Sequence, residues 1–132
     1  MNQFSLSIES RDGAAVIRVT GEIDVASVQD LDACVHKARS HYSPHLILDL
    51  AEVDFMDCTG LRVLADASTN IRNDGGSVAI ARPSRQAAHL FEVSGLPQEL
   101  EIYRTIEQAM DGMRSQAGTV RRRAARSAVE LG

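Results

Sequence analysis

The segment HLILDLAEVDFMDCTGLRVL, residues 45–64, decides the fold. Its first part, residues 46–50, is a short apolar run with one interruption at Asp49. A run of this length is too brief for a helix, and apolar residues on both faces are typical of a central strand covered on each side. Residues 46–50 therefore predict a buried strand.

A helix is expected to follow this strand almost at once. After the tight turn at residues 57–60, apolar and small residues recur at helical spacing: Leu61, Leu64, Ala65, Ser68 and Ile71. Thr59 is thus expected at a helix N-terminus, where the first N–H groups lack intrahelical partners and the macrodipole adds positive charge. Such a position favours anions, so a phosphate on Thr59 would bring about −1.5 to −2 charges to a prepared site in front of any docked protein.

Two motifs resemble those of the anti-sigma factor antagonist family, whose members carry STAS domains. The segment from Asp49 to Leu61 is similar to the family signature, in which Asp-Ser-Ser/Thr-Gly-Leu stands where a strand meets a helix. Residues 21–24, Gly-Glu-Ile-Asp, match the second marker. The sequence departs from the commonest pattern at two positions, because Cys58 stands where Ser is usual and Thr59 replaces Ser as the acceptor.

The resemblance implies a bacterial regulator that binds an anti-sigma factor and so frees a sigma factor. The partner would be a serine/threonine kinase of the histidine-kinase-like ATPase type. Phosphorylation of the acceptor hydroxyl, which falls on Thr59, would release that partner. The expected partner-binding residues are Glu22, Asp24, Met56, Asp57, Cys58, Gly60 and Leu61.

Length and composition place the chain among single-domain proteins. Its 132 residues suffice for one core, and 44% hydrophobic residues with only five aromatics are typical of an aliphatic core in an α/β or α+β protein. The first residues lack the features of a signal peptide, and no apolar run approaches the roughly 20 residues that span a bilayer. Two cysteines, Cys34 and Cys58, are too few for a disulfide framework. We therefore expect a cytoplasmic protein without membrane contact.

Charge is distributed unevenly along the chain. The formal net charge is −4, but four arginines against one glutamate give residues 115–132 a local charge of +3, which leaves −7 for residues 1–114. The acidic body argues against direct nucleic-acid binding. Helical periodicity ends after Met113, so we expect a domain over residues 1–114 and a disordered, arginine-rich tail over residues 115–132. Binding of this tail to nucleic acid or an anionic surface is disfavoured because no aromatic residues are interleaved with the arginines.

The remaining sequence predicts a hairpin followed by alternating helices and strands. Apolar and polar residues alternate over residues 4–9 and again from Ala15 to Val19, on either side of an Asp-Gly turn, and Gly21 is expected to end the second strand. A helix is expected over residues 26–39, capped by Asp24 or Ser27, and the helix after Gly60 is expected to stop at residues 73–76, before a strand over 77–82.

Two further helices are expected near the end of the domain, with an edge strand over residues 101–103 between them. The first runs from Ser84 to Ser94, is stopped by Gly95, Leu96 and Pro97, and presents the apolar residues Ala87, Ala88, Phe91 and Val93. The second is opened by Thr105 and Gln108 and presents the apolar residues Ile106, Ala109, Met110 and Met113.

The order of these elements sets the fold class. Each later strand is joined to the preceding strand by a crossover helix, which requires parallel pairing, whereas the first two strands form an antiparallel hairpin. We predict a single α/β domain with a mixed β-sheet, an N-terminal hairpin and then parallel strands, covered by about four helices. This architecture agrees with the STAS fold that the resemblance implies.

Several expected site residues also have structural interpretations. Asp24 and Asp57 are each suited to cap a helix, and a hydroxyl such as that of Thr59 can do the same. The Asp57 carboxylate is alternatively suited to orient the acceptor hydroxyl. Leu61 and Met56 suit the core or its rim, and Met56 is the better candidate for adaptable apolar contact with a partner.

Other functional classes stay open. A scaffold, or a regulatory subunit of a transporter or signalling complex, would use the same fold without phosphorylation. A cysteine-dependent enzyme would use Cys58, because a thiol at a helix N-terminus can become nucleophilic, but no histidine is close in sequence. Walker-type loops, zinc-protease motifs and Cys-x-x-Cys pairs are absent from the sequence, so we expect no enzymatic activity, cofactor or metal. Monomer and weak dimer both stay possible.

Overall fold

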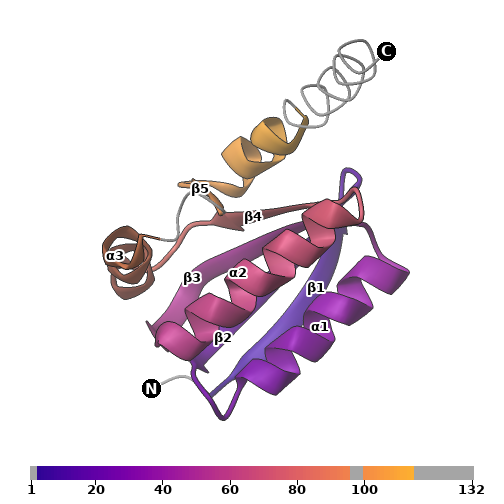
Figure 1. Ribbon diagram of the computed structural model, residues 1–132. Coiled ribbons are helices and arrows are strands. Elements are labelled where there is room, and N and C mark those ends of the chain that lie inside the picture. The colour runs from indigo at the N-terminus through magenta and orange to yellow at the C-terminus, as the bar shows by residue number, and fades with distance from the viewer. Residues whose placement is uncertain (1–2, 96–99, 115–132) are drawn as a thin grey trace, which may run out of the picture.

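Five strands form one sheet in the order β1-β2-β3-β4-β5 in the computed structural model, which describes residues 3–95 and 100–114 (Figure 1). β1 and β2 are antiparallel, and every later neighbouring pair is parallel. The predicted α/β domain with a mixed sheet is therefore confirmed. The elements are β1 (Ser5–Arg11), β2 (Ala14–Ile23), α1 (Val28–His41), β3 (His45–Met56), α2 (Cys58–Asn73), β4 (Ser77–Ala81), α3 (Arg85–Ser94), β5 (Glu101–Tyr103) and a C-terminal helix over residues 106–114.

The predicted hairpin turn lies at Asp12 and Gly13. Both residues have positive φ, 49° and 87°, as a two-residue hairpin turn requires when it follows the twist of its strands. Glycine adopts this conformation without a steric penalty, and aspartate is among the residues that tolerate it best. The turn brings β1 alongside β2 from Ser5, opposite Thr20, to Arg11, opposite Ala14.

The two central strands are longer than the sequence indicates. The prediction that Gly21 ends β2 is wrong, because β2 continues to Ile23 and shifts register between Gly21 and Glu22. Gly21, with φ at 98°, lies at this register shift, which resembles a β-bulge, and β2 continues beyond it. β3 likewise runs past Leu50 to Met56, where it pairs with Ile23. Both strands thus end side by side.

Helices cover the two faces of the sheet unequally. Figure 1 shows α1 and α2 lying side by side across one face, where α3 adds Ala87 and Phe91 to the same apolar core. The C-terminal helix packs on the opposite face against residues such as Val16 and Ile47. Its buried residues are those that the helical spacing predicted: Ile106, Ala109, Met110 and Met113.

The helix ends follow the expected signals with some differences. α1 begins at Val28, two residues later than predicted, and neither candidate side chain caps it in the usual way: Ser27 makes no cap hydrogen bond, and Asp24 accepts instead from the Ala26 N–H. α2 ends where predicted, with Gly75 in the left-handed region at φ 88°.

The third helix is capped as predicted but differs in one buried residue. The Ser84 hydroxyl accepts from the Ala87 N–H at 3.3 Å, and Gly95 ends α3 with φ at 75°. Burial of Val93 was expected and is wrong, because this side chain is 64% exposed on the outer side of the helix. The Leu96-Pro97 part of the stop signal and the expected tail over residues 115–132 lie outside the described residues.

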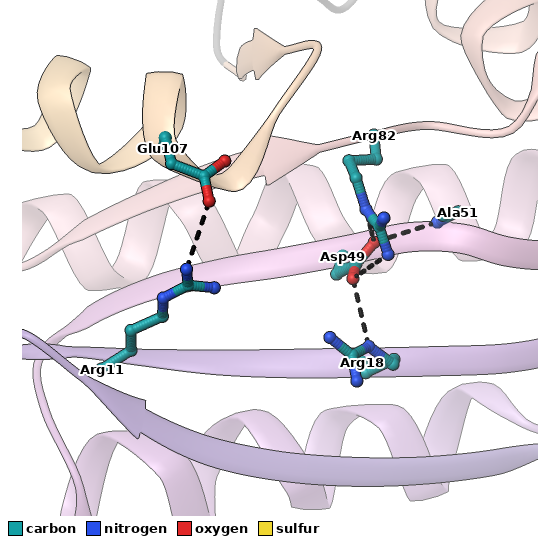
Figure 2. A network of polar contacts seen from close by, with 6 residues as sticks. All are labelled: Arg11, Arg18, Asp49, Ala51, Arg82 and Glu107. Atoms are coloured by element: carbon teal, nitrogen blue, oxygen red, sulfur yellow. Dashed lines mark hydrogen bonds and ion pairs between the residues drawn. The ribbon is translucent and has the colours of Figure 1, made fainter.

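A buried carboxylate lies on the sheet face opposite α1 and α2. The Asp49 side chain is fully buried, and it accepts hydrogen bonds from Arg18 Nε at 3.2 Å, from Arg82 Nε and Nη2 at 3.1 and 2.8 Å, and from the Ala51 N–H at 3.2 Å (Figure 2). Burial by itself raises the pKa of Asp49, but the hydrogen bonds from Arg82, Ala51 and Arg18 outweigh it and hold the pKa below its ordinary value. The two arginines are half-exposed and cover the carboxylate.

Substitution of Asp49 is expected to change the acid stability of the domain. Because the folded-state pKa is depressed, the stabilisation is present above the unfolded value of about 4 and is lost as the pH falls through the folded value. We expect Asp49→Asn to lower the free energy of unfolding by about 3 kcal/mol at pH 7, the low end for a broken buried pair because both arginines retain water. Denaturant titrations between acid and neutral pH should show this deficit shrinking towards acid pH.

The ion pair between Arg11 and Glu107 provides the control, since its atoms also lie 3.2 Å apart but its carboxylate is 70% exposed, whereas that of Asp49 is buried (Figure 2). Glu107→Gln should cost less than about 1 kcal/mol. A pH-independent deficit in Asp49→Asn would contradict the assignment.

Candidate functional site

The first turn of α2 is held by the side chain of Asp57. Asp57 is the N-cap: its Oδ1 accepts from the Gly60 N–H at 3.1 Å, and its backbone oxygen accepts from the Leu61 N–H at 3.1 Å. The structural interpretation of Asp57 is therefore confirmed. Thr59 follows as the second residue of the helix and does not act as its cap.

Thr59 is exposed and chemically available. Its hydroxyl has no hydrogen-bond partner among the described residues, and neither do the backbone N–H groups of Cys58 and Thr59 within that same part of the chain. Two unpaired N–H groups at the positive end of a 16-residue helix favour negative charge at this point. The turn combines a free hydroxyl with a place where an attached anion is stabilised.

Gly60 permits the acceptor turn, which is the turn at residues 57–60 that carries the predicted acceptor Thr59, to lie against the end of β2. A Cβ atom at Gly60 would lie 2.5 Å from Ile23 Cγ2 and 3.2 Å from the Ile23 carbonyl oxygen, distances that other residues cannot adopt without movement. The Asp57 N–H also donates to the Ile23 carbonyl at 3.1 Å. Because Glu22 and Asp24 flank Ile23, the last residue of β2, both lie beside the start of α2.

The expected site residues differ in how far they are exposed to solvent. Cys58 and Thr59 are exposed; Glu22, Asp24 and Asp57 are half-buried; Met56, Gly60 and Leu61 are buried. All of them belong to the two segments that meet at Gly60 and Ile23.

Met56 is not available for the adaptable surface contact that was expected of it. Its side chain is fully buried in the core under α1 and α2, and the Leu61 side chain is 2% exposed in the same core. The physical reason is the register of β3: two steps of β3, from Val53 to Phe55, oppose one step of β2, so Met56 joins Val53 in the core and its neighbour Phe55 points outward. Phe55 is 43% exposed and pairs across the sheet with Glu22.

Three further residues at this end of the sheet were missed in the sequence. Phe55 and Val25 are large apolar side chains left exposed, Val25 to 75%, one on each of the two segments that meet at the acceptor turn. Strand alternation through Met56 was the signal for Phe55. Gln86, from α3, makes two hydrogen bonds to the backbone of Met56, and no local pattern marks this contact across 30 residues.

The described residues offer neither a metal site nor a membrane-spanning helix. In residues 3–95 and 100–114, no three His, Cys, Asp or Glu side chains gather closely enough to hold a metal ion. No helix in these ranges combines the length and apolar character needed to cross a bilayer.

Known proteins share both the sequence pattern and the fold. A family model described as the STAS domain matches residues 5–109. The anti-sigma-F factor antagonist RsfB of Mycobacterium tuberculosis is 27% identical over 115 residues, which cover 86% of this chain and 92% of RsfB. The crystal structure of an anti-sigma factor antagonist from Mycobacterium paratuberculosis superposes with a TM-score of 0.77 at 23% identity, covering 85% of this chain and 95% of that chain. SpoIIAA, a Bacillus cell fate determinant solved in its phosphorylated form, gives a TM-score of 0.61 at 24% identity, covering 83% and 97%.

The close approach at Gly60 can be tested by adding one methyl group. Gly60→Ala should destabilise the domain even though alanine is the better helix former by about 1 kcal/mol, because the new Cβ would overlap Ile23 Cγ2. Overpacking of this kind costs about 1–3 kcal/mol. Chemical denaturation measures the net effect.

A double-mutant cycle with Ile23→Ala separates the overlap from other effects of Gly60→Ala. Ile23→Ala removes the Cγ2 atom, so the methyl group at position 60 should cost less in that background, with a coupling of more than about 0.5 kcal/mol. Strict additivity of the two substitutions would argue against the steric role of Gly60.

Proposed function

Because the chain belongs to the STAS domain family, we propose that it is an anti-sigma factor antagonist: a cytoplasmic binding protein, not an enzyme, that sequesters an anti-sigma factor and frees a sigma factor. RsfB and the structural neighbours support the role, since they are named as antagonists of this kind. One observation carries the proposal for this chain: Thr59 presents an exposed hydroxyl, unpartnered among the described residues, at the positive end of α2, whose first turn packs against the end of β2.

The proposed docking surface surrounds Thr59. Its apolar contacts come from the exposed side chains of Val25 and Phe55, and its polar rim from Glu22, Asp24 and Asp57. An apolar centre with a polar margin is the usual composition of a specific protein interface. Cys58 lies within this surface, whereas the buried Met56, Gly60 and Leu61 support it from below.

The bound anti-sigma factor is proposed to be a serine/threonine kinase of the histidine-kinase-like ATPase type. The Thr59 hydroxyl oxygen attacks the γ-phosphorus of ATP, the bond from that phosphorus to the β,γ-bridging oxygen breaks, and ADP leaves. A base on the kinase takes the hydroxyl proton. Positioning and charge stabilisation dominate catalysis of phosphoryl transfer, so the antagonist has only to present its hydroxyl in a fixed place.

Phosphorylation is proposed to end the complex through electrostatics. The phosphate adds about −1.5 to −2 charges to a surface that already carries Glu22, Asp24 and Asp57. Inside a docked interface this charge loses water without gaining a matched cation, which costs several kcal/mol. The SpoIIAA structure in its phosphorylated form supports the idea that this fold accommodates the modification.

Variants of Thr59 test the binding switch. Thr59→Glu should weaken binding to the cognate anti-sigma factor at least about tenfold, which is about 1.4 kcal/mol, because the carboxylate brings charge into the interface. Thr59→Ala should bind like the wild type. Titration calorimetry measures both affinities.

Thr69→Glu is the matched control for added charge. Thr69 is also exposed on α2 but lies ten residues further along, about 15 Å down the helix axis, so its substitution should leave binding unchanged. Equal affinities for Thr59→Glu and Thr59→Ala would defeat the switch and favour the alternative of a scaffold or transporter subunit that works without phosphorylation.

The site of modification can be identified directly. Incubation of the purified chain with candidate anti-sigma kinases and ATP should add a single phosphate to the peptide that contains Thr59, as detected by mass spectrometry. The exposed Thr69 on the same helix should remain unmodified, and phosphate found there instead would contradict the assignment of the acceptor.

A further inference from the structure

The end of β3 that carries the acceptor turn has no neighbouring strand on its β4 side. β3 continues to Met56, but β4 stops at Ala81, which pairs with Asp49. The chain leaves the sheet at Arg82, whose left-handed φ of 51° turns it towards α3. Residues 50–56 therefore present backbone N–H and C=O groups along an edge that β4 does not reach.

Unpaired backbone groups are costly when they are buried, and Met56 is fully buried. The segment leading into α3 supplies the missing partners. The Ser84 N–H donates to the Leu50 carbonyl at 3.2 Å, which continues the ladder by one hydrogen bond. The Gln86 side chain then accepts from the Met56 N–H through Oε1 and donates to the Met56 carbonyl through Nε2, each at 2.8 Å.

The amide of Gln86 thus pairs with both backbone groups of Met56, as a residue of an adjacent strand would. A primary amide suits this pairing because it presents a donor N–H and an acceptor oxygen side by side. Gln86 is itself anchored, because the next residue, Ala87, and then Phe91 are buried in the core beneath α3. Met56 immediately precedes Asp57, the cap on which the first turn of α2 depends.

We propose that Gln86 is a positioning residue for the acceptor turn, which fixes the backbone from which Thr59 is presented to the kinase. This role rests on the proposed phosphorylation of Thr59. A displacement of about 1 Å can slow a positioned reaction by as much as 100-fold, so looseness at Met56 lowers the rate of phosphoryl transfer. Through Gln86, α3 thus contributes to the proposed switch although it is remote in sequence from Thr59.

The test combines amide hydrogen exchange with phosphorylation kinetics on three variants. Gln86→Met keeps the length of the side chain but removes both hydrogen bonds, and Gln86→Glu keeps only the acceptor for the Met56 N–H. Thr105→Ala is the control, because it removes the side-chain cap of the C-terminal helix, where the Thr105 hydroxyl accepts from the Gln108 N–H at 3.0 Å, and leaves α3 and Met56 untouched.

In Gln86→Met, the Met56 amide should exchange about tenfold faster relative to Leu48, which is paired on both sides in the middle of β3. In the same variant, kcat/KM for phosphorylation of Thr59 should fall at least about fivefold, since the acceptor is less well placed. Gln86→Glu should retain most of the Met56 protection and lie between the wild type and Gln86→Met in rate. Thr105→Ala should change neither the relative exchange of Met56 nor the rate by more than about twofold.

Each result decides the matter. Unchanged Met56 exchange in Gln86→Met overturns the proposal whatever the kinase does, and so does equal loss of phosphorylation in Thr105→Ala and Gln86→Met. Failure of every candidate kinase to modify the wild type would contradict the proposed phosphorylation of Thr59. The exchange measurement would still decide whether Gln86 holds the backbone of Met56 in place.

Discussion

The structure depends on the contact between the end of β2 and the first turn of α2. Ile23 lies so close to residue 60 that only glycine fits there without displacement, and the Ile23 carbonyl accepts the Asp57 N–H. This contact places the end of a strand and the start of a helix, more than 30 residues apart in sequence, side by side. Residues 22–24 lie beside the first turn of α2 only because the two backbones approach this closely.

The unequal lengths of neighbouring strands give the sheet its functional end. β2 and β3 extend together to Ile23 and Met56, well past the last pairing of β3 with β4. Their projecting ends support the acceptor turn, and α3 occupies the position that a longer β4 would have filled. At the point where β4 ends, the Arg82 side chain reaches back to Asp49 and donates two hydrogen bonds to it. The turn that ends the strand therefore also positions an arginine that covers the buried carboxylate.

Much of the fold follows from local signals in the sequence, and the errors in the lengths of the strands have one physical origin. The hairpin turn, the cap at Ser84 and the stop at Gly75 were predictable because each depends on a few adjacent residues. The lengths of β2 and β3 were not, since pairing between strands carries a chain through a glycine such as Gly21 that would otherwise end a strand.

The same limit applies to the site. The helix start at residues 57–60 was recognisable from its own residues, but the inward direction of Met56 follows from the register of β3. The hydrogen bonds from Gln86 follow from the docking of α3, which no local pattern encodes. The contacts between segments that are distant in sequence therefore could not be predicted, and such contacts form the surface beside Thr59.

A phosphate on Thr59 would encounter opposite influences in the free and docked states, and the proposed switch works through their difference. In the free protein, the unpaired N–H groups of Cys58 and Thr59 and the helix dipole stabilise an anion that remains in water. In the complex the same anion is desolvated beside Glu22, Asp24 and Asp57. A modification shifts an equilibrium only by its differential interaction with the two states. Stabilisation of the free form and penalty in the bound form therefore add, and both drive release.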